Sequence, residues 1–164
     1  PGTRIDTSDF FGVENEFHGG EIGLACEMRH NCFTIDVLGR VALGNNRQEV
    51  TVDGSTVVFD GTDSLYFNEG LLAQRSNIGV HRRDRFAIIP EVQVNLGYQI
   101  NGNVKARVGY TMIYWFDALR AGDQIDLQVN LNQGVQPQPA VPTVPFATAD
   151  WWLQGINAGL EVQF

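Results

Sequence analysis

The amino-acid sequence predicts an all-β fold of antiparallel strands, and three observations lead to that prediction. Apolar and polar residues alternate with a period of two in several separate segments, as in strands with two unlike faces. The 164 residues include 18 glycines and 10 phenylalanines, a composition that favours strands and tight turns. No segment has the roughly 18 to 20 consecutive apolar residues of a membrane-spanning helix. The length fits a single domain, residues 1–164.

The alternation is clearest in segments 86–100, 104–116 and 152–164, where even-numbered positions are mostly apolar and odd-numbered positions mostly polar. Each segment is therefore predicted to form a strand with one apolar and one polar face. The apolar rows include Val94, Leu96, Tyr98, Val108, Tyr110, Leu160 and Val162. The polar rows include Glu91, Gln93, Asn95, Lys105, Arg107 and Glu161.

A hairpin joins the first two of these strands at residues 101–103, where Asn-Gly-Asn tolerates positive φ. We expect a three-residue loop that pairs Ile100 with Val104, because this register sets apolar residues against apolar ones throughout. Pro90 lacks a backbone donor and predicts a bulge or a strand end.

Weaker alternation predicts four further strands, at 16–29, 33–43, 48–59 and 68–81. The seven strands are roughly 10 to 15 residues long, longer than soluble sheets need and sufficient to cross a bilayer at a tilt. An even barrel of about eight strands needs one more, from residues 3–13, from sequence upstream or from a partner chain.

Residues 117–148 are rich in Pro and Gln toward their end and are interpreted as one long external loop between the spanning strands of 16–116 and 149–164. Alternation at Ile125, Leu127, Val129 and Leu131 leaves open a short strand or a loop hairpin within it. Asp117, Asp123 and Asp126 lack the spacing of a calcium loop, and we assign no metal.

The completeness of the apolar rows predicts that they face lipid, with aromatic residues near the strand ends, while the polar rows face a lumen. The fold class is then an antiparallel up-and-down transmembrane β-barrel with its apolar face outward. Charges on the polar face line a wet interior or, alternatively, pair with one another and fill a narrow barrel. The soluble alternative is a lipocalin-like ligand-binding barrel with its apolar residues inside.

The charged and nucleophilic residues exclude several functions. A net charge of −8 argues against nucleic-acid binding, which needs clustered Lys and Arg. Cys26 and Cys32 either form a disulfide at a hairpin end or remain two free thiols. The three histidines show neither metal-ligand spacing nor a catalytic motif, so we predict no enzyme, metal or cofactor.

Short glycine-centred motifs recur in order along the chain, and the last strand ends in alternating Leu160, Val162 and Phe164. The motifs are 17–23 (FHGGEIG), 42–44 (ALG), 70–73 (GLLA), 76–79 (SNIG), 90–91 (PE), 96–98 (LGY), 108–110 (VGY), 120–126 (RAGDQID) and 154–164. In these motifs, residues 10–164 resemble the C-terminal part of bacterial outer-membrane β-barrel proteins of the putative β-barrel porin seven family. In such proteins a terminal residue like Phe164 is an assembly signal.

The resemblance implies a location in the bacterial outer membrane, with membrane lipid and the barrel-assembly machinery as partners, and it implies no catalytic residues. The resemblance also leaves the N-terminal part of such proteins outside this chain. An eight-stranded barrel is filled by its own side chains, so conductance needs more strands or more chains. We therefore expect a structural, anchoring or porin-like role, with other envelope proteins or further chains completing the sheet.

Overall fold

The computed structural model describes residues 2–130 and 141–162, and most of them lie in strands. The strands are β1 (Arg4–His30), β2 (Phe33–Phe59), β3 (Ser64–Phe67), β4 (Gly79–Asn101), β5 (Val104–Leu119) and β6 (Thr148–Val162), with a short 3-10 helix, η1 (Ala121–Gln124). The predicted all-β class is confirmed. The described residues include no helix that is long and apolar enough to cross a membrane.

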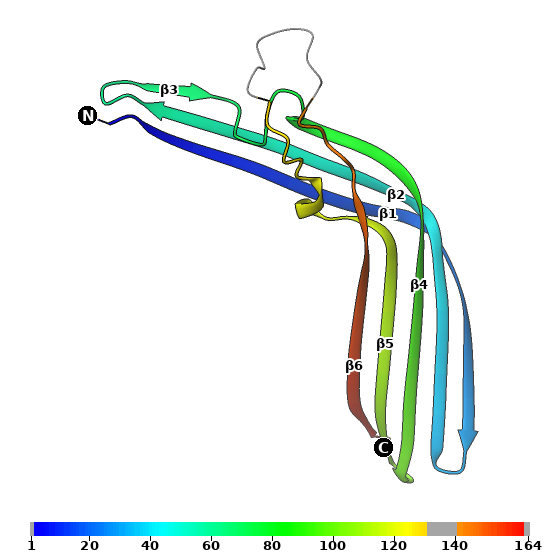
Figure 1. The fold of residues 1–164 in the computed structure, drawn as a ribbon. Coiled ribbons are helices and arrows are strands. Elements are labelled where there is room, and N and C mark those ends of the chain that lie inside the picture. Colours follow the sequence, from blue (N-terminus) through cyan, green and yellow to red (C-terminus); the bar gives the residue numbers. More distant parts are fainter. Residues whose placement is uncertain (1, 131–140, 163–164) are drawn as a thin grey trace. The chain divides into compact units, whose positions relative to one another are not determined.

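The strands form one sheet in the order β1-β2-β4-β5-β6, with β3 paired to β2 at Thr56–Phe59 (Figure 1). Apart from the short β3, each strand lies beside the next strand along the chain, and the strands run antiparallel. The predicted antiparallel, up-and-down arrangement is therefore confirmed. This arrangement follows from chain connections too short for crossovers between β1 and β2 and between β4 and β5.

The predicted register of the β4–β5 hairpin is confirmed along the strands and wrong at the turn. Tyr98 pairs with Ala106 as predicted, as do the further pairs down to Val92 and Met112. At the turn, however, Asn101 pairs with Val104, and the register shifts between Gln99 and Asn101. The side chain of Asn101 causes the difference, because its Oδ1 accepts hydrogen bonds from the backbone N–H groups of Asn103 and Val104, both at 2.9 Å. Ile100 is left as a bulge.

The strands β1, β2 and β4 extend beyond the segments that alternation predicted. Residues 3–13, one of the three possible sources of an additional strand, and the predicted strand 16–29 belong to the single strand β1, apart from Thr3 before it. The predicted strands 33–43 and 48–59 are likewise one strand, β2, which runs through Asn45 and Asn46. Pro90 neither ends nor interrupts β4. Asn45, Asn46 and Pro90 lie inside long strands that are bonded to neighbouring strands, and this context outweighs their local preference for a turn.

The predicted strand at 68–81 is wrong, because strand structure begins only at Gly79. Residues 68–78 form an irregular segment that is tied to β1 through one carboxylate. Asp9 Oδ1 accepts hydrogen bonds from the backbone N–H groups of Leu72 at 3.1 Å and Ala73 at 2.8 Å. No strand forms over 125–130, and Leu131 lies outside the described residues.

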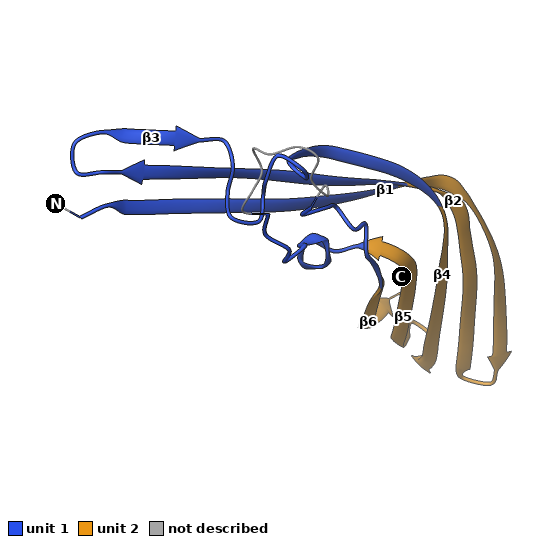
Figure 2. Cartoon of the chain, turned by 45° about the horizontal axis from the view of Figure 1, so that its top comes forward, with its two compact units in different colours: residues 1–16, 47–85, 119–149 blue, residues 17–46, 86–118, 150–164 orange. Residues whose placement is uncertain are grey.

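The chain divides into two compact units (Figure 2), each made of three segments. Unit 1 comprises residues 1–16, 47–85 and 119–149, and unit 2 comprises residues 17–46, 86–118 and 150–164. The short turns at 31–32 and 102–103 lie in unit 2, whereas the longer connections from β2 to β4 and from β5 to β6 lie in unit 1. The prediction of one domain, 1–164, stays a prediction.

The core of unit 1 shows that part of the predicted external loop packs on the sheet. Its buried residues are Val50, Val52, Ala73 and Leu119. Partly buried Phe11, Val13, Ile78, Val144 and Phe146 pack against them. The contact of β1 with the start of this segment is specific. Asn15 Nδ2 donates to the backbone oxygen of Leu119 at 3.1 Å, and its Oδ1 accepts from the Leu119 N–H at 2.9 Å.

Candidate functional site

The candidate site is the pair of faces that the strands of unit 2 present. One face, here called the polar face, carries charged and amide side chains, several of which form ion pairs with one another. The other, here called the apolar face, carries the alternate residues of the same strands. The residues of the polar face whose contacts are described below are Glu21, Arg40, Glu91, Asn95, Lys105, Arg107, Asn157 and Glu161.

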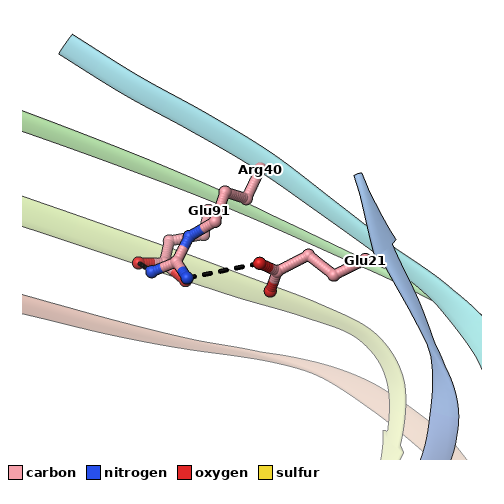
Figure 3. Close-up of polar contacts among 3 residues, drawn as sticks. All are labelled: Glu21, Arg40 and Glu91. Carbon is pink, nitrogen blue, oxygen red and sulfur yellow. Dashed lines mark hydrogen bonds and ion pairs between the residues drawn. The ribbon is translucent and has the colours of Figure 1, made fainter. Parts of the chain in front are cut away.

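Arg40 of β2 is the centre of the polar contacts, because it joins three neighbouring strands (Figure 3). Its Nη2 donates to Glu91 Oε1 on β4 at 2.6 Å, and its Nη1 donates to Glu21 Oε1 on β1 at 3.2 Å. Gly23 gives the guanidinium stem its space, since a Cβ there would lie 2.8 Å from Arg40 Cγ. The Glu91 side chain retains only 17% exposure, so the contact with Arg40 replaces part of its hydration.

Two further glycines make room for polar side chains on the same face. A Cβ at Gly97 would collide with Lys105, whose stem lies across that position. A Cβ at Gly109 would collide with Asn95 and lie 2.7 Å from Asn157 Oδ1, so both amides lie over this glycine of β5. Glycine in a strand interior weakens the strand, and here it is explained by this close approach.

The predicted lumen residues Arg107 and Glu161 form an ion pair, with Nε and Oε2 3.3 Å apart. Glu91 also has a partner, but that partner is Arg40, which sequence reasoning missed. Arg40 occupies the position opposite in parity to Val37, Val41 and Leu43. The same alternation rule would therefore have found it.

An aromatic contact shows which way the sheet of unit 2 curls. Phe17 of β1 and Trp115 of β5 stack edge to face, with ring centroids 6.3 Å apart. In the sheet, β2 and β4 lie between β1 and β5, which in a flat sheet separates the two backbones by about 14 Å. Phe17 and Trp115 have the odd parity of Glu21 and Glu91. The contact therefore makes the polar face the concave one.

The apolar face of unit 2 is exposed and nearly free of charge in its described part. Leu24 is 84% exposed, Ile156 80% and Leu160 71%. The predicted lipid-facing residues Leu96, Tyr98, Val108, Tyr110 and Val162 are also exposed, and Val94 is half-buried. An isolated protein in water would leave this apolar surface uncovered, which marks it as a surface for contact with an apolar medium or partner.

Polar atoms on the apolar face are paired between β5 and β6. Tyr110 donates its hydroxyl to Gln154 Oε1 at 2.8 Å, and Tyr114 donates to Asp150 Oδ2 at 2.7 Å. Gln154 is the one polar break in the apolar row of 152–164, and its hydrogen bond accounts for it. Sequence reasoning did not find these pairs, because they join strands separated by a long connection.

Unit 1 differs from unit 2, because its strands carry charged residues at positions that have the parity of the apolar face. Glu14 and Glu16 of β1 share a shallow depression with Arg47 and Glu49 of β2. Arg82 of β4 donates its Nε to Glu49 Oε2 at 2.6 Å. These side chains need water or charged partners around them.

The side chain of Asp126 in unit 1 binds the backbone of its own loop. Asp126 Oδ2 accepts from the Thr143 backbone N–H at 2.9 Å, and its Oδ1 accepts from the Gln128 N–H at 3.0 Å. These hydrogen bonds from backbone N–H groups lower the pKa of Asp126, and the bond from Thr143 has the largest effect. Across residues 2–130 and 141–162, no three His, Cys, Asp or Glu residues are grouped so as to hold a metal ion.

The remaining predicted site residues lie apart from these contacts. Cys26 on β1 and Cys32 in the β1–β2 turn are both exposed, free thiols, so the structure does not contain the disulfide that the sequence left open. Phe164, the predicted assembly signal, lies outside the described residues. Gln93 pairs with Thr111 on the polar side of the β4–β5 hairpin.

An up-and-down antiparallel sheet with a concave polar face and an exposed apolar face is the architecture of a β-barrel membrane protein. A family model described as putative beta barrel porin-7 (BBP7) matches residues 1–164, and the chain belongs to this family. The match extends to the whole chain, beyond the residues 10–164 in which the sequence shows the resemblance. No curated protein and no solved structure matches the chain.

Proposed function

We propose that this chain is part of a non-catalytic, porin-like β-barrel of the bacterial outer membrane. In this proposal unit 2 crosses the bilayer. The apolar face meets the acyl chains, and the polar face lines the interior. Membership of a porin family supports the class of function.

The observation that carries the proposal is the concave polar face of unit 2, fixed by the Phe17–Trp115 contact. A soluble lipocalin-like barrel needs the reverse curvature, with its apolar residues inside. Turning Arg40 and Glu91 toward hydrocarbon would cost several kcal/mol, whereas the aliphatic rows lose nothing there. The curvature and the chemistry of the two faces therefore favour a membrane barrel.

Strand length and charge support unit 2 as the part within the bilayer. It contains residues 17–30, 33–46, 86–101, 104–118 and 150–162 of the five long strands, each longer than the roughly 9 to 11 residues that a tilted spanning strand requires. The charged surface around Glu49 and Arg82 in unit 1 is unsuited to hydrocarbon. We assign unit 1 to the aqueous side.

The lengths of the connections between strands support one orientation of the chain across the outer membrane. Bacterial barrels have short periplasmic turns and longer external loops. The turns at 31–32 and 102–103 belong to unit 2, and the longer connections belong to unit 1. Unit 1 is then external, where it is accessible to other envelope proteins. The chain would reach this state through the barrel-assembly machinery.

The two native thiols test the membrane assignment. Cys26 has the even parity of Leu24 and Met28 on the apolar side of β1, whereas Cys32 lies in the turn. In lipid nanodiscs, which leave both membrane surfaces open, a charged maleimide should label Cys32 rapidly and Cys26 at least about tenfold more slowly. Single Cys→Ser variants read each thiol separately, and denaturant should make both react. Equal labelling of both thiols in folded nanodisc samples would refute the assignment.

Planar-bilayer recording tests the porin-like role. Discrete conductance steps are the expected result, and Gln93→Cys on the polar face should make them sensitive to a charged thiol reagent. If the folded, inserted protein is silent, the porin-like role is wrong. A filled barrel with a structural or anchoring role would then explain the silence.

A further inference from the structure

The apolar face of unit 2 contains a groove. It has a volume of about 470 Å³ and crosses β2, β4 and β5. Its apolar side chains are Phe33, Ile35, Leu96, Tyr98, Ala106 and Val108. All of these residues belong to unit 2.

The sequence forms this groove by placing one small residue among large ones. Tyr98 of β4 pairs with Ala106 of β5, and Leu96 pairs with Val108 in the next row. Phe33 of β2 stands against Tyr98 on the other side, with ring centroids 4.9 Å apart and planes tilted by 49°. Ala106 extends only a methyl group between these walls, and the depression lies above it.

The chemistry of the lining limits what can fill the groove. Thr34 and Arg107 also border it, but both have the parity of the polar face, and Arg107 is paired with Glu161. A protein partner would be expected to meet a polar rim around an apolar centre. Here the surroundings on neighbouring strands are again exposed apolar residues, such as Leu24 of β1 and Leu160 of β6.

We propose that this groove binds one acyl chain of a membrane lipid. The inference rests on the proposed function, in which the apolar face meets lipid. A hydrocarbon chain needs no hydrogen bond, and it fills a void that would otherwise lack contacts with its lining. The site therefore holds a lipid more tightly than the rest of the apolar face does.

Lipid retention after extraction tests this site. The folded protein is taken from nanodiscs of phosphatidylethanolamine into mild detergent, and bound lipid per chain is counted by mass spectrometry. The unchanged protein should retain about one lipid under conditions that strip the rest. Ala106→Phe fills the groove and should lower retention at least about tenfold. Ala158→Phe adds the same ring on β6, outside the groove, and should retain lipid like the unchanged protein.

The outcomes test lipid binding in the groove separately from the proposed placement of unit 2 in the membrane. Equal lipid retention by Ala106→Phe and the unchanged protein would overturn the proposal that the groove binds lipid. Equal loss of lipid in both phenylalanine variants would also overturn it. Labelling of Cys26 in the same nanodiscs reports on the proposed function independently, since a shielded thiol means that unit 2 faces lipid. If Ala106→Phe fails to fold, Tyr98→Ala removes one wall instead. It should also lower retention, and unchanged retention by it overturns the proposal.

Discussion

Placing an arginine on each face of one strand tests the orientation of unit 2 most directly. Val94 and Gln93 are adjacent in β4, near the middle of residues 86–101, and they pair with Tyr110 and Thr111 respectively. Val94→Arg directs a charge toward the acyl chains, whereas Gln93→Arg directs the same charge into the interior. Backbone position and chain length are matched between the two variants.

The expected magnitude follows from the depth of the site. An arginine facing lipid near the bilayer midplane destabilises a barrel by about 2–4 kcal/mol. An arginine in a wet, polar interior should change stability by less than about 1 kcal/mol. With a urea dependence of about 1–3 kcal/mol per molar, Val94→Arg should lower the unfolding midpoint by about 0.7–4 M.

The assay is urea unfolding of the protein in lipid vesicles, followed by tryptophan fluorescence, with refolding curves to establish reversibility. The free energies of unfolding of both variants are compared with that of the unchanged protein. A large loss for Gln93→Arg together with a negligible loss for Val94→Arg would refute the reasoning. That result would place the apolar face in a packed interior.

Three further predictions concern single residues. Arg40→Ala should lower the free energy of unfolding by about 1–3 kcal/mol, because it leaves two carboxylates without their shared partner. Arg107→Ala should lower it by less than about 1 kcal/mol. Urea unfolding measures both losses. Asp126→Asn should destabilise at neutral pH, and this effect should shrink as the pH falls below the usual carboxyl pKa of about 4 and through the lowered pKa of Asp126. A carboxyl with a lowered pKa contributes its stability fully only above its usual pKa. Gly19→Ala should cost about 1–3 kcal/mol, since its Cβ would collide with a backbone oxygen of β2, whereas Gly20→Ala should be tolerated because nothing lies within 4 Å.

Different results would contradict each of these expectations. Equal losses of unfolding free energy for Arg40→Ala and Arg107→Ala would mean that the two contacts of Arg40, with β1 and with β4, stabilise the protein no more than one exposed ion pair does. An Asp126→Asn effect that grows toward low pH would contradict the direction of its pKa shift. Equal tolerance of alanine at positions 19 and 20 would show that the strands can move apart there. Circular dichroism on each variant checks that the sheet is retained.

Alternation was sufficient to predict which residues share a face, because the side-chain period of a strand is two whatever the strand's length. The pairing of Leu96 with Val108 followed from it, since one residue of slip would set apolar against polar side chains. The turn itself was not predictable in this way. There the side chain of Asn101 decides the loop length through its own hydrogen bonds.

Strand ends and long-range contacts were beyond sequence reasoning. Asn45, Asn46 and Pro90 favour turns locally, but pairing with neighbouring strands keeps them extended. The two bonds between Asn15 and Leu119 join residues 104 positions apart, and no local pattern indicates them. For the same reason Arg40 was identifiable as a polar-face residue, while its role as the link between β1 and β4 was not.

The order of the sheet restricts how it can be closed. Its main path has five strands, β1-β2-β4-β5-β6. Because neighbouring strands are antiparallel, the two edge strands β1 and β6 run in the same direction. Two copies set edge to edge would meet at both seams as parallel neighbours, in contrast to the antiparallel pairing of bacterial barrels. A seamless antiparallel ring therefore requires each copy of this sheet to be joined by an odd number of additional strands.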